Sequence, residues 1–137
     1  NRGHRFGYDN FKKKQLSSLI KICTRLIKKY KIKKKNIVGH SDIAPLRKID
    51  PGEKFPWKYL SSNGIGIYPL LKIKKNNLFN PQNKLFFNYL NKIGYRYLKT
   101  NFKKKIIKNF QRRYRSKKTD GILDQETMQI AKFLSKR

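Results

Sequence analysis

The sequence predicts an α/β segment in the N-terminal half and a small all-α bundle of three helices in the C-terminal half. Apolar residues recur every three or four positions over residues 10–30, which is typical of an amphipathic helix, and residues 36–39 have the pattern of a short buried strand. The helical periodicity returns three times after residue 80. The predicted organisation is a first domain over 1–70, a linker over 71–80 and a helical domain over 81–137.

The three helices of the second domain are predicted over residues 81–93, 101–114 and 124–134. Gly94 ends the first of them, because a glycine just past a helix adopts the left-handed conformation without steric cost. Asp120 and Gly121 predict a turn, and Asp124 is placed to cap the last helix, with Thr127 in its first turn.

The charge of the chain is strongly unbalanced. Its 137 residues include 36 Lys or Arg and 7 Asp or Glu, which gives a net charge of +29. Such a charge favours an anionic partner, but the lysines are spread over the whole chain, so compositional drift on solvated faces explains it as well. No apolar run approaches about 20 residues, which excludes a transmembrane helix. The single cysteine, Cys23, excludes a disulfide scaffold.

The aperiodic segment over residues 40–56 carries the candidate chemistry. His40 directly follows the predicted strand, and Asp50 lies ten residues later on a proline-containing loop that can fold back towards it. Imidazole nitrogen and carboxylate oxygen both suit Zn²⁺. Lys48 shares a face with Asp50 in an extended chain, where its ammonium would stabilise an oxyanion. On spacing alone, a hydrogen-bonded or exposed pair is the commoner outcome, and Asp42 competes with Asp50 as a ligand or forms an Asx turn.

Residues 37–60, IVGHSDIAPLRKIDPGEKFPWKYL, closely resemble the end of the zinc-dependent N-acetylmuramoyl-L-alanine amidase domain of the type-2 amidase family, in its AmiD-like branch. The pieces GHSDIAP, RK, DPG and FPW stand in the family's order and spacing. The resemblance implies that His40 and Asp50 are zinc ligands and that Lys48 assists catalysis. It also implies that residues 1–70 are the C-terminal part of an α/β amidase domain, a mixed sheet flanked by helices. The family's first zinc-binding His and its catalytic Glu would both precede Asn1.

The pieces FQRR and DGxxDxxT in the C-terminal half resemble the peptidoglycan-binding domain that follows the catalytic domain in this branch. Most of these residues are expected to be structural, with Phe110 in the core. Tyr95, Tyr97 and Arg112 are candidates to contact glycan or stem peptide if they are exposed. Arg47 is a candidate to bind a stem-peptide carboxylate, and a solvated role is its alternative.

The function implied by the resemblance is hydrolysis of the amide bond between N-acetylmuramic acid and L-alanine in peptidoglycan. Zn²⁺ is the implied cofactor, peptidoglycan or muropeptides are the implied partners, and the periplasm or cell envelope is the expected location, with an outer-membrane anchor preceding this chain as one option. Two alternatives stay open: a peptidoglycan-binding protein without catalysis, and a charge-driven nucleic-acid binder, for which the sequence contains no motif.

Overall fold

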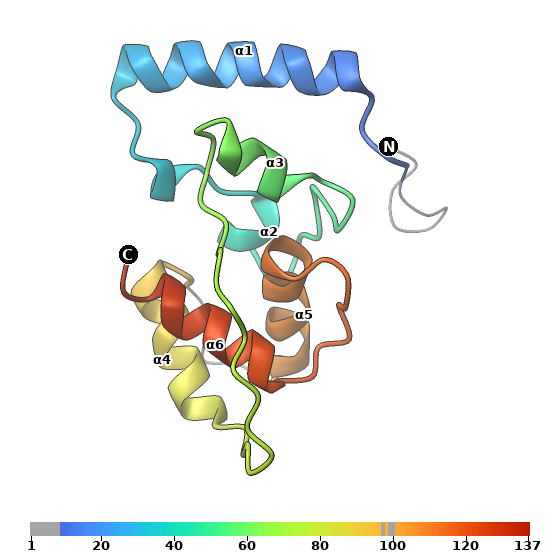
Figure 1. Ribbon diagram of the computed structural model, residues 1–137, viewed down its shortest axis with the longest axis vertical. Helices are drawn as coiled ribbons and strands as arrows, with labels where there is room; N and C mark the ends of the chain where they lie inside the picture. The colour runs from blue at the N-terminus through green and yellow to red at the C-terminus, as the bar shows by residue number, and fades with distance from the viewer. Residues whose placement is uncertain (1–8, 97, 99–100) are drawn as a thin grey trace.

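The computed structural model describes residues 9–96, 98 and 101–137, which fold into helices joined by ordered loops (Figure 1). The elements in chain order are α1 (Lys13–Tyr30), the 3₁₀ turn η1 (Lys34–Asn36), α2 (His40–Ile43), α3 (Trp57–Ser62), α4 (Asn83–Ile93), α5 (Lys103–Tyr114) and α6 (Gln125–Leu134). In Figure 1, α1 lies across one end of the molecule and α4, α5 and α6 lie at the other, with α2 and α3 between them. None of the helices in the described part of the chain is long and apolar enough to span a membrane.

The predicted α/β class is wrong for the described residues, which contain no strand and no sheet. Residues 36–39 were expected to form a strand. Asn36 instead ends the 3₁₀ turn η1, whereas Ile37 and Gly39 do have extended backbone. An extended segment becomes part of a sheet only when a second backbone pairs with it. Here the carbonyl oxygen of Ile37 accepts a hydrogen bond from the Arg113 side chain at 3.0 Å instead. The three C-terminal helices form as predicted, beginning one or two residues later.

Two apolar clusters hold the described chain together. The larger one lies among α4, α5 and α6, where the rings of Phe86 and Phe110 meet edge to face with their centroids 5.4 Å apart. The smaller one surrounds Trp57 on α3 and receives the apolar face of α1. Leu46 and Ile67, from the N-terminal half, pack against the larger cluster, so the two halves share a buried boundary.

Residues 71–80, expected to be a linker, run along α6 (Figure 1). The Gln129 side chain accepts a hydrogen bond from the Lys74 backbone N–H at 2.9 Å and donates one to the Lys74 carbonyl at 2.6 Å. The Gln125 side chain accepts from the Asn76 backbone N–H at 3.1 Å. A side-chain amide thus supplies the donor and the acceptor that a neighbouring strand would supply. The division into domains at this segment stays a prediction.

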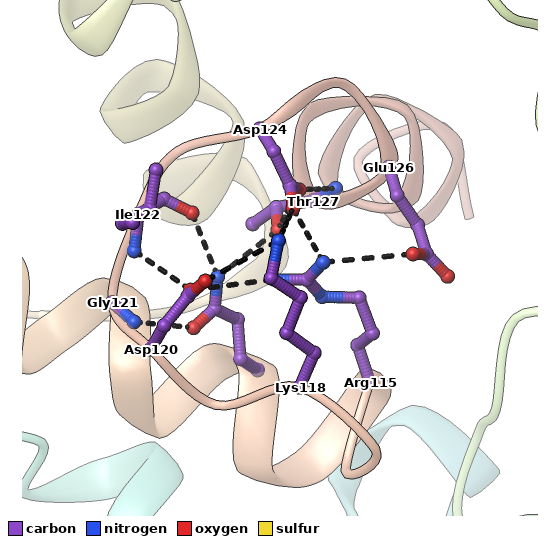
Figure 2. Close-up of polar contacts among 9 residues, drawn as sticks. Arg115, Lys118, Asp120, Gly121, Ile122, Asp124, Glu126 and Thr127 are labelled. Carbon is purple, nitrogen blue, oxygen red and sulfur yellow. Dashed lines mark hydrogen bonds and ion pairs between the residues drawn. The ribbon is translucent and has the colours of Figure 1, made fainter.

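Gln111 of α5 fixes the turn that leads into α6. Figure 2 shows the turn residues Asp120, Gly121 and Ile122. The Gln111 amide oxygen accepts from the backbone N–H of Gly121 at 2.8 Å. Its amide nitrogen donates to the Ile122 carbonyl at 2.8 Å and to the Thr127 hydroxyl at 3.2 Å. Gly121 has φ of +78°, a left-handed conformation that favours glycine. The turn predicted at this position is therefore present, and α5 is the element that shapes it.

Asp124 caps α6, as its position in the sequence predicts. Its side chain accepts from the Thr127 backbone N–H at 3.0 Å and from the Thr127 hydroxyl at 2.7 Å. The buried guanidinium of Arg115 lies against the same carboxylate and also within ion-pair distance of Asp120 and Glu126 (Figure 2). The carboxylate of Asp124 therefore both caps α6 and pairs with the buried guanidinium of Arg115.

The contacts of Asp124 predict acid sensitivity. Burial alone would raise the pKa of its carboxyl, but the hydrogen bonds from Thr127 and the charge of Arg115 outweigh burial and lower the pKa below the ordinary value of 3.8. A lowered pKa in the folded state adds stability that is present above the unfolded value and is lost as the pH falls through the folded value. We expect the free energy of unfolding, measured in urea, to fall below about pH 4, and to fall less in Asp124→Asn, because asparagine still caps the helix but cannot be protonated there.

Thr127→Val is a graded test of the same assignment. It removes the hydroxyl hydrogen bond, which lowers the pKa of Asp124 more than any other contact, but it keeps the backbone donor of residue 127 and the pairing with Arg115. We therefore expect an acid dependence between those of the wild type and Asp124→Asn. Identical acid profiles for the wild type and Asp124→Asn would contradict the assignment.

Candidate active site

The candidate site lies on the loop that begins with the short helix α2. The backbone N–H of Gly39 donates to the Asp42 side chain at 2.7 Å, which closes the first turn. The backbone N–H of Ser41 donates to the Asp50 carbonyl at 3.0 Å, which brings the two ends of the loop together. A side chain at Gly39 would place its Cβ 2.8 Å from Cδ of Pro51, so the close approach requires glycine. Local backbone contacts therefore set the geometry of the loop.

The loop brings together the two residues that the sequence analysis named as zinc ligands. His40 Nδ1 lies 3.1 Å from Asp50 Oδ2, and the two side chains are 48% and 61% exposed. A tetrahedral Zn²⁺ with ligands at about 2.0–2.2 Å would hold two of them about 3.3–3.6 Å apart, close to the observed separation. The donor types and their spacing therefore fit one edge of a zinc site. Within the described residues no third His, Cys, Asp or Glu joins them.

The third and fourth candidates, Lys48 and Arg47, follow the short helix on the same loop. The backbone N–H groups of both residues donate to the Ala44 carbonyl, at 2.9 Å from Lys48 and 3.0 Å from Arg47. Lys48 is partly buried and its carbonyl accepts from the Asn109 side chain at 3.0 Å. Arg47 is exposed, which is compatible with both a substrate contact and a solvated role. The roles of these four residues stay predictions.

Asp42, the alternative ligand, lies elsewhere and has other partners. Its carboxylate is buried and accepts from the Tyr95 hydroxyl at 2.7 Å and from the Gly39 backbone. The same carboxylate forms an ion pair with Arg113 at 3.0 Å. Because these donors occupy both of its oxygens, Asp42 is a structural residue, and Asp50 is the carboxylate that faces His40.

Arg113 of α5 lies between the loop and α3. Its guanidinium carbon is 3.6 Å from the centroid of the Trp57 ring, and the residue is 4% exposed. Burial alone would lower the pKa of Arg113, but the neighbouring Tyr114 and Asp42 outweigh it and raise the pKa, so the guanidinium is charged. Burial and the adjacent Asp42 carboxylate raise the pKa of Tyr95 well above its ordinary value, so its hydroxyl remains a donor.

The candidates proposed for a glycan contact are corrected by the structure. Tyr95 is 3% exposed and Arg112 is 7% exposed, so neither is available on the surface. Tyr95 is bonded to Asp42, and Arg112 is paired with Glu53 at 3.4 Å. Tyr97 lies outside the described residues. A tyrosine or arginine in isolation carries no sequence signal that separates a surface contact from a buried polar one.

Two residues that the sequence analysis did not assign to the site, Asn109 and Arg113, contact its loop directly. The signal that could have identified them is their spacing on α5. Asn109, Arg112 and Arg113 are polar residues three and four positions apart, so they share a helix face beside the buried Phe110. A polar face on a helix that is otherwise buried indicates a polar partner.

Comparison with known proteins gives a consistent result. Residues 1–53 match the family Amidase_2, described as N-acetylmuramoyl-L-alanine amidase. The chain is 48% identical over 59 residues to the N-acetylmuramoyl-L-alanine amidase AmiD of Escherichia coli, which covers 43% of this chain and 21% of AmiD. It is 54% identical over 50 residues to the 1,6-anhydro-N-acetylmuramyl-L-alanine amidase AmpD of Haemophilus influenzae, covering 35% of this chain and 27% of AmpD.

Solved structures extend the similarity beyond the matched sequence. Escherichia coli AmiD, in complex with the substrate anhydro-N-acetylmuramic acid-L-Ala-D-gamma-Glu-L-Lys, matches 95% of this chain with a TM-score of 0.87 and 30% identity. AmpDh3 of Pseudomonas aeruginosa, in complex with anhydromuramic pentapeptide, matches 92% with a TM-score of 0.82 and 28% identity. This chain spans 54% and 53% of those two chains. The resemblance to the AmiD-like type-2 amidases is thereby confirmed, over residues 1–53 by sequence and over most of the chain by structure.

Proposed function

We propose that this chain carries part of the active site of an N-acetylmuramoyl-L-alanine amidase, which hydrolyses the amide bond between N-acetylmuramic acid and L-alanine in peptidoglycan or its fragments. The observation that carries the proposal is the contact between His40 and Asp50 at 3.1 Å, on a loop inside the family match. The solved relatives that hold muramoyl peptides support this class of substrate. We place the activity in the cell envelope, where such a substrate occurs.

Each of the four loop residues has a chemical role in this proposal. His40 and Asp50 would hold Zn²⁺, which when bound supplies a Lewis acid and lowers the pKa of a bound water. The ammonium of Lys48 would stabilise the negative charge that develops on the oxygen of the scissile carbonyl. The exposed Arg47 would bind a carboxylate of the stem peptide. A further zinc ligand and the general base would come from outside the described residues, as the family resemblance implies.

Peptidoglycan binding without hydrolysis is the second candidate function. The observation that favours it is that His40 and Asp50 would supply only two ligands, and the described residues contain no third His, Cys, Asp or Glu beside them. In this case the helical bundle would bind the wall, and zinc would have no effect on the substrate. The two candidates differ in whether the protein releases free amino termini of L-alanine from a muramoyl peptide.

We expect His40→Ala and Asp50→Ala each to weaken Zn²⁺ binding at least tenfold, because each variant removes one ligand. The measurement is isothermal titration of the purified protein with Zn²⁺. Asp120→Asn is the matched control, since it removes a carboxylate on the turn before α6, far from the loop in sequence. Equal affinity in the wild type and in both alanine variants would remove the pair from the metal site.

We expect Lys48→Ala to keep Zn²⁺ affinity but to lower turnover by about 10²–10³-fold, the usual effect of removing one group that stabilises an oxyanion. The assay measures free L-alanine amino termini released from a muramoyl tripeptide. Lys54→Ala, an exposed lysine six residues later, should retain turnover. Turnover that survives Lys48→Ala would exclude this lysine from the reaction. A wild-type protein that binds zinc and peptidoglycan but releases no termini would support the second candidate function.

A further inference from the structure

The loop that carries the proposed site rests on the central helix of the bundle. Asn109 of α5 is 1% exposed, and its side-chain nitrogen donates to the carbonyls of Pro45 and Lys48. The side chain of Arg112 donates to the oxygen of the same Asn109 amide, which leaves only the nitrogen to face the loop. The orientation of this amide is therefore set from two sides. Through it, α5 holds the backbone of Lys48.

A second contact from the same helix brackets His40. The guanidinium of Arg113 donates to the Ile37 carbonyl at 3.0 Å, three residues before His40, and pairs with Asp42 at 3.0 Å, two residues after it. The face of this guanidinium lies 3.6 Å from the centre of the Trp57 ring, which limits its sideways movement. One rigid, planar group therefore fixes the chain on both sides of His40.

We propose that Asn109 and Arg113 are positioning residues for the amidase reaction, so that the helical bundle is part of the scaffold of the active site. This inference rests on the proposed function. Neither side chain touches the reacting atoms. Arg113 acts through the backbone at Ile37 and the carboxylate of Asp42, and Asn109 acts through the carbonyls of Pro45 and Lys48. A displacement of about 1 Å at a reacting group is enough to lower turnover about 10²-fold, so small losses of support should be measurable.

The chain contains a matched control for a purely structural effect. Arg115 is the C-cap residue of the same helix, two residues after Arg113, and is 6% exposed against 4% for Arg113. Its ion pairs in the described chain are with Asp120, Asp124 and Glu126, which lie on the turn into α6 and in the first turn of α6, and not with the loop. Arg115→Lys therefore disturbs an equally buried arginine of the bundle without touching the contacts that bracket His40.

The experiment compares Arg113→Lys, Asn109→Ala and Arg115→Lys by amide hydrogen exchange. The reporter of the loop is the Ser41 N–H, which closes it on Asp50, and the reporter of the bundle end is the Thr127 N–H, which is held by Asp124. Amides in the middle of α6 report global unfolding. We expect Ser41 to exchange at least tenfold faster in the first two variants, relative to the α6 amides, and Thr127 to respond in Arg115→Lys alone.

Steady-state kinetics on the zinc-loaded protein complete the test. We expect kcat to fall about 10–100-fold in Arg113→Lys and Asn109→Ala with KM changed less than threefold, while Arg115→Lys keeps both within threefold. If one of the two loop variants does not fold, the other still tests the proposal, because the two side chains contact different parts of the loop.

Two results would overturn the proposal. One is exchange at Ser41 that rises only in parallel with the α6 amides, because that shows a general loss of stability. The other is an unchanged kcat in the variants whose Ser41 amide exchanges faster. A wild-type protein that lacks amidase activity, but in which Ser41 still responds selectively, would defeat the proposed function and leave the structural coupling between α5 and the loop in place.

Discussion

The burial of the Arg113 guanidinium determines how the two halves of the described chain meet. Arg113 is only 4% exposed. Burying a charged side chain costs free energy unless other polar groups replace the water around it. Arg113 satisfies this with the carboxylate of Asp42, the carbonyl of Ile37 and the face of Trp57, which all come from the N-terminal half. Removing one partner of such a pair typically costs about 3–5 kcal/mol. The relation of α5 to α2 and α3 is therefore fixed by a polar contact as well as by apolar packing.

This constraint separates the two aspartates of the loop into different roles. Asp42 is buried and its oxygens are occupied by Gly39, Tyr95 and Arg113, so it cannot approach a ligand without breaking the contact between the halves. The Asp50 side chain is 61% exposed, and within the described residues it contacts the side chain of His40. Asp42 therefore has a structural role, whereas the carboxylate of Asp50 lies beside the imidazole of His40. Residues with the same chemistry and only eight positions apart differ because one of them meets α5.

The sequence predicted the helices well because each has an apolar stripe at helical spacing, and it predicted the Asp124 cap because that side chain acts on its own helix. The spacing of His40 and Asp50 indicated only that Asp50 can fold back towards His40, and the family resemblance implied that the two act together; their side chains lie 3.1 Å apart. The strand at residues 36–39 was wrong because pairing is a property of two segments, and the partner here is the side chain of Arg113. Tyr95 and Arg112 do not meet the condition of exposure for a glycan contact. Their burial could not be predicted because their partners, Asp42 and Glu53, are distant in sequence.

The same reasoning gives the net charge of +29 a structural context. Only nine of the 36 basic residues are arginines, and three of those nine lie close together at the end of α5, all of them buried. Five of the seven acidic residues, namely Asp42, Glu53, Asp120, Asp124 and Glu126, pair with these three arginines. A lysine cannot replace the planar fork of donors at such positions, whereas a solvated surface position accepts either residue. Arginine is therefore favoured over lysine where the side chain is buried against a carboxylate. The buried arginines at the end of α5 are thus basic residues whose identity the contacts of the fold require.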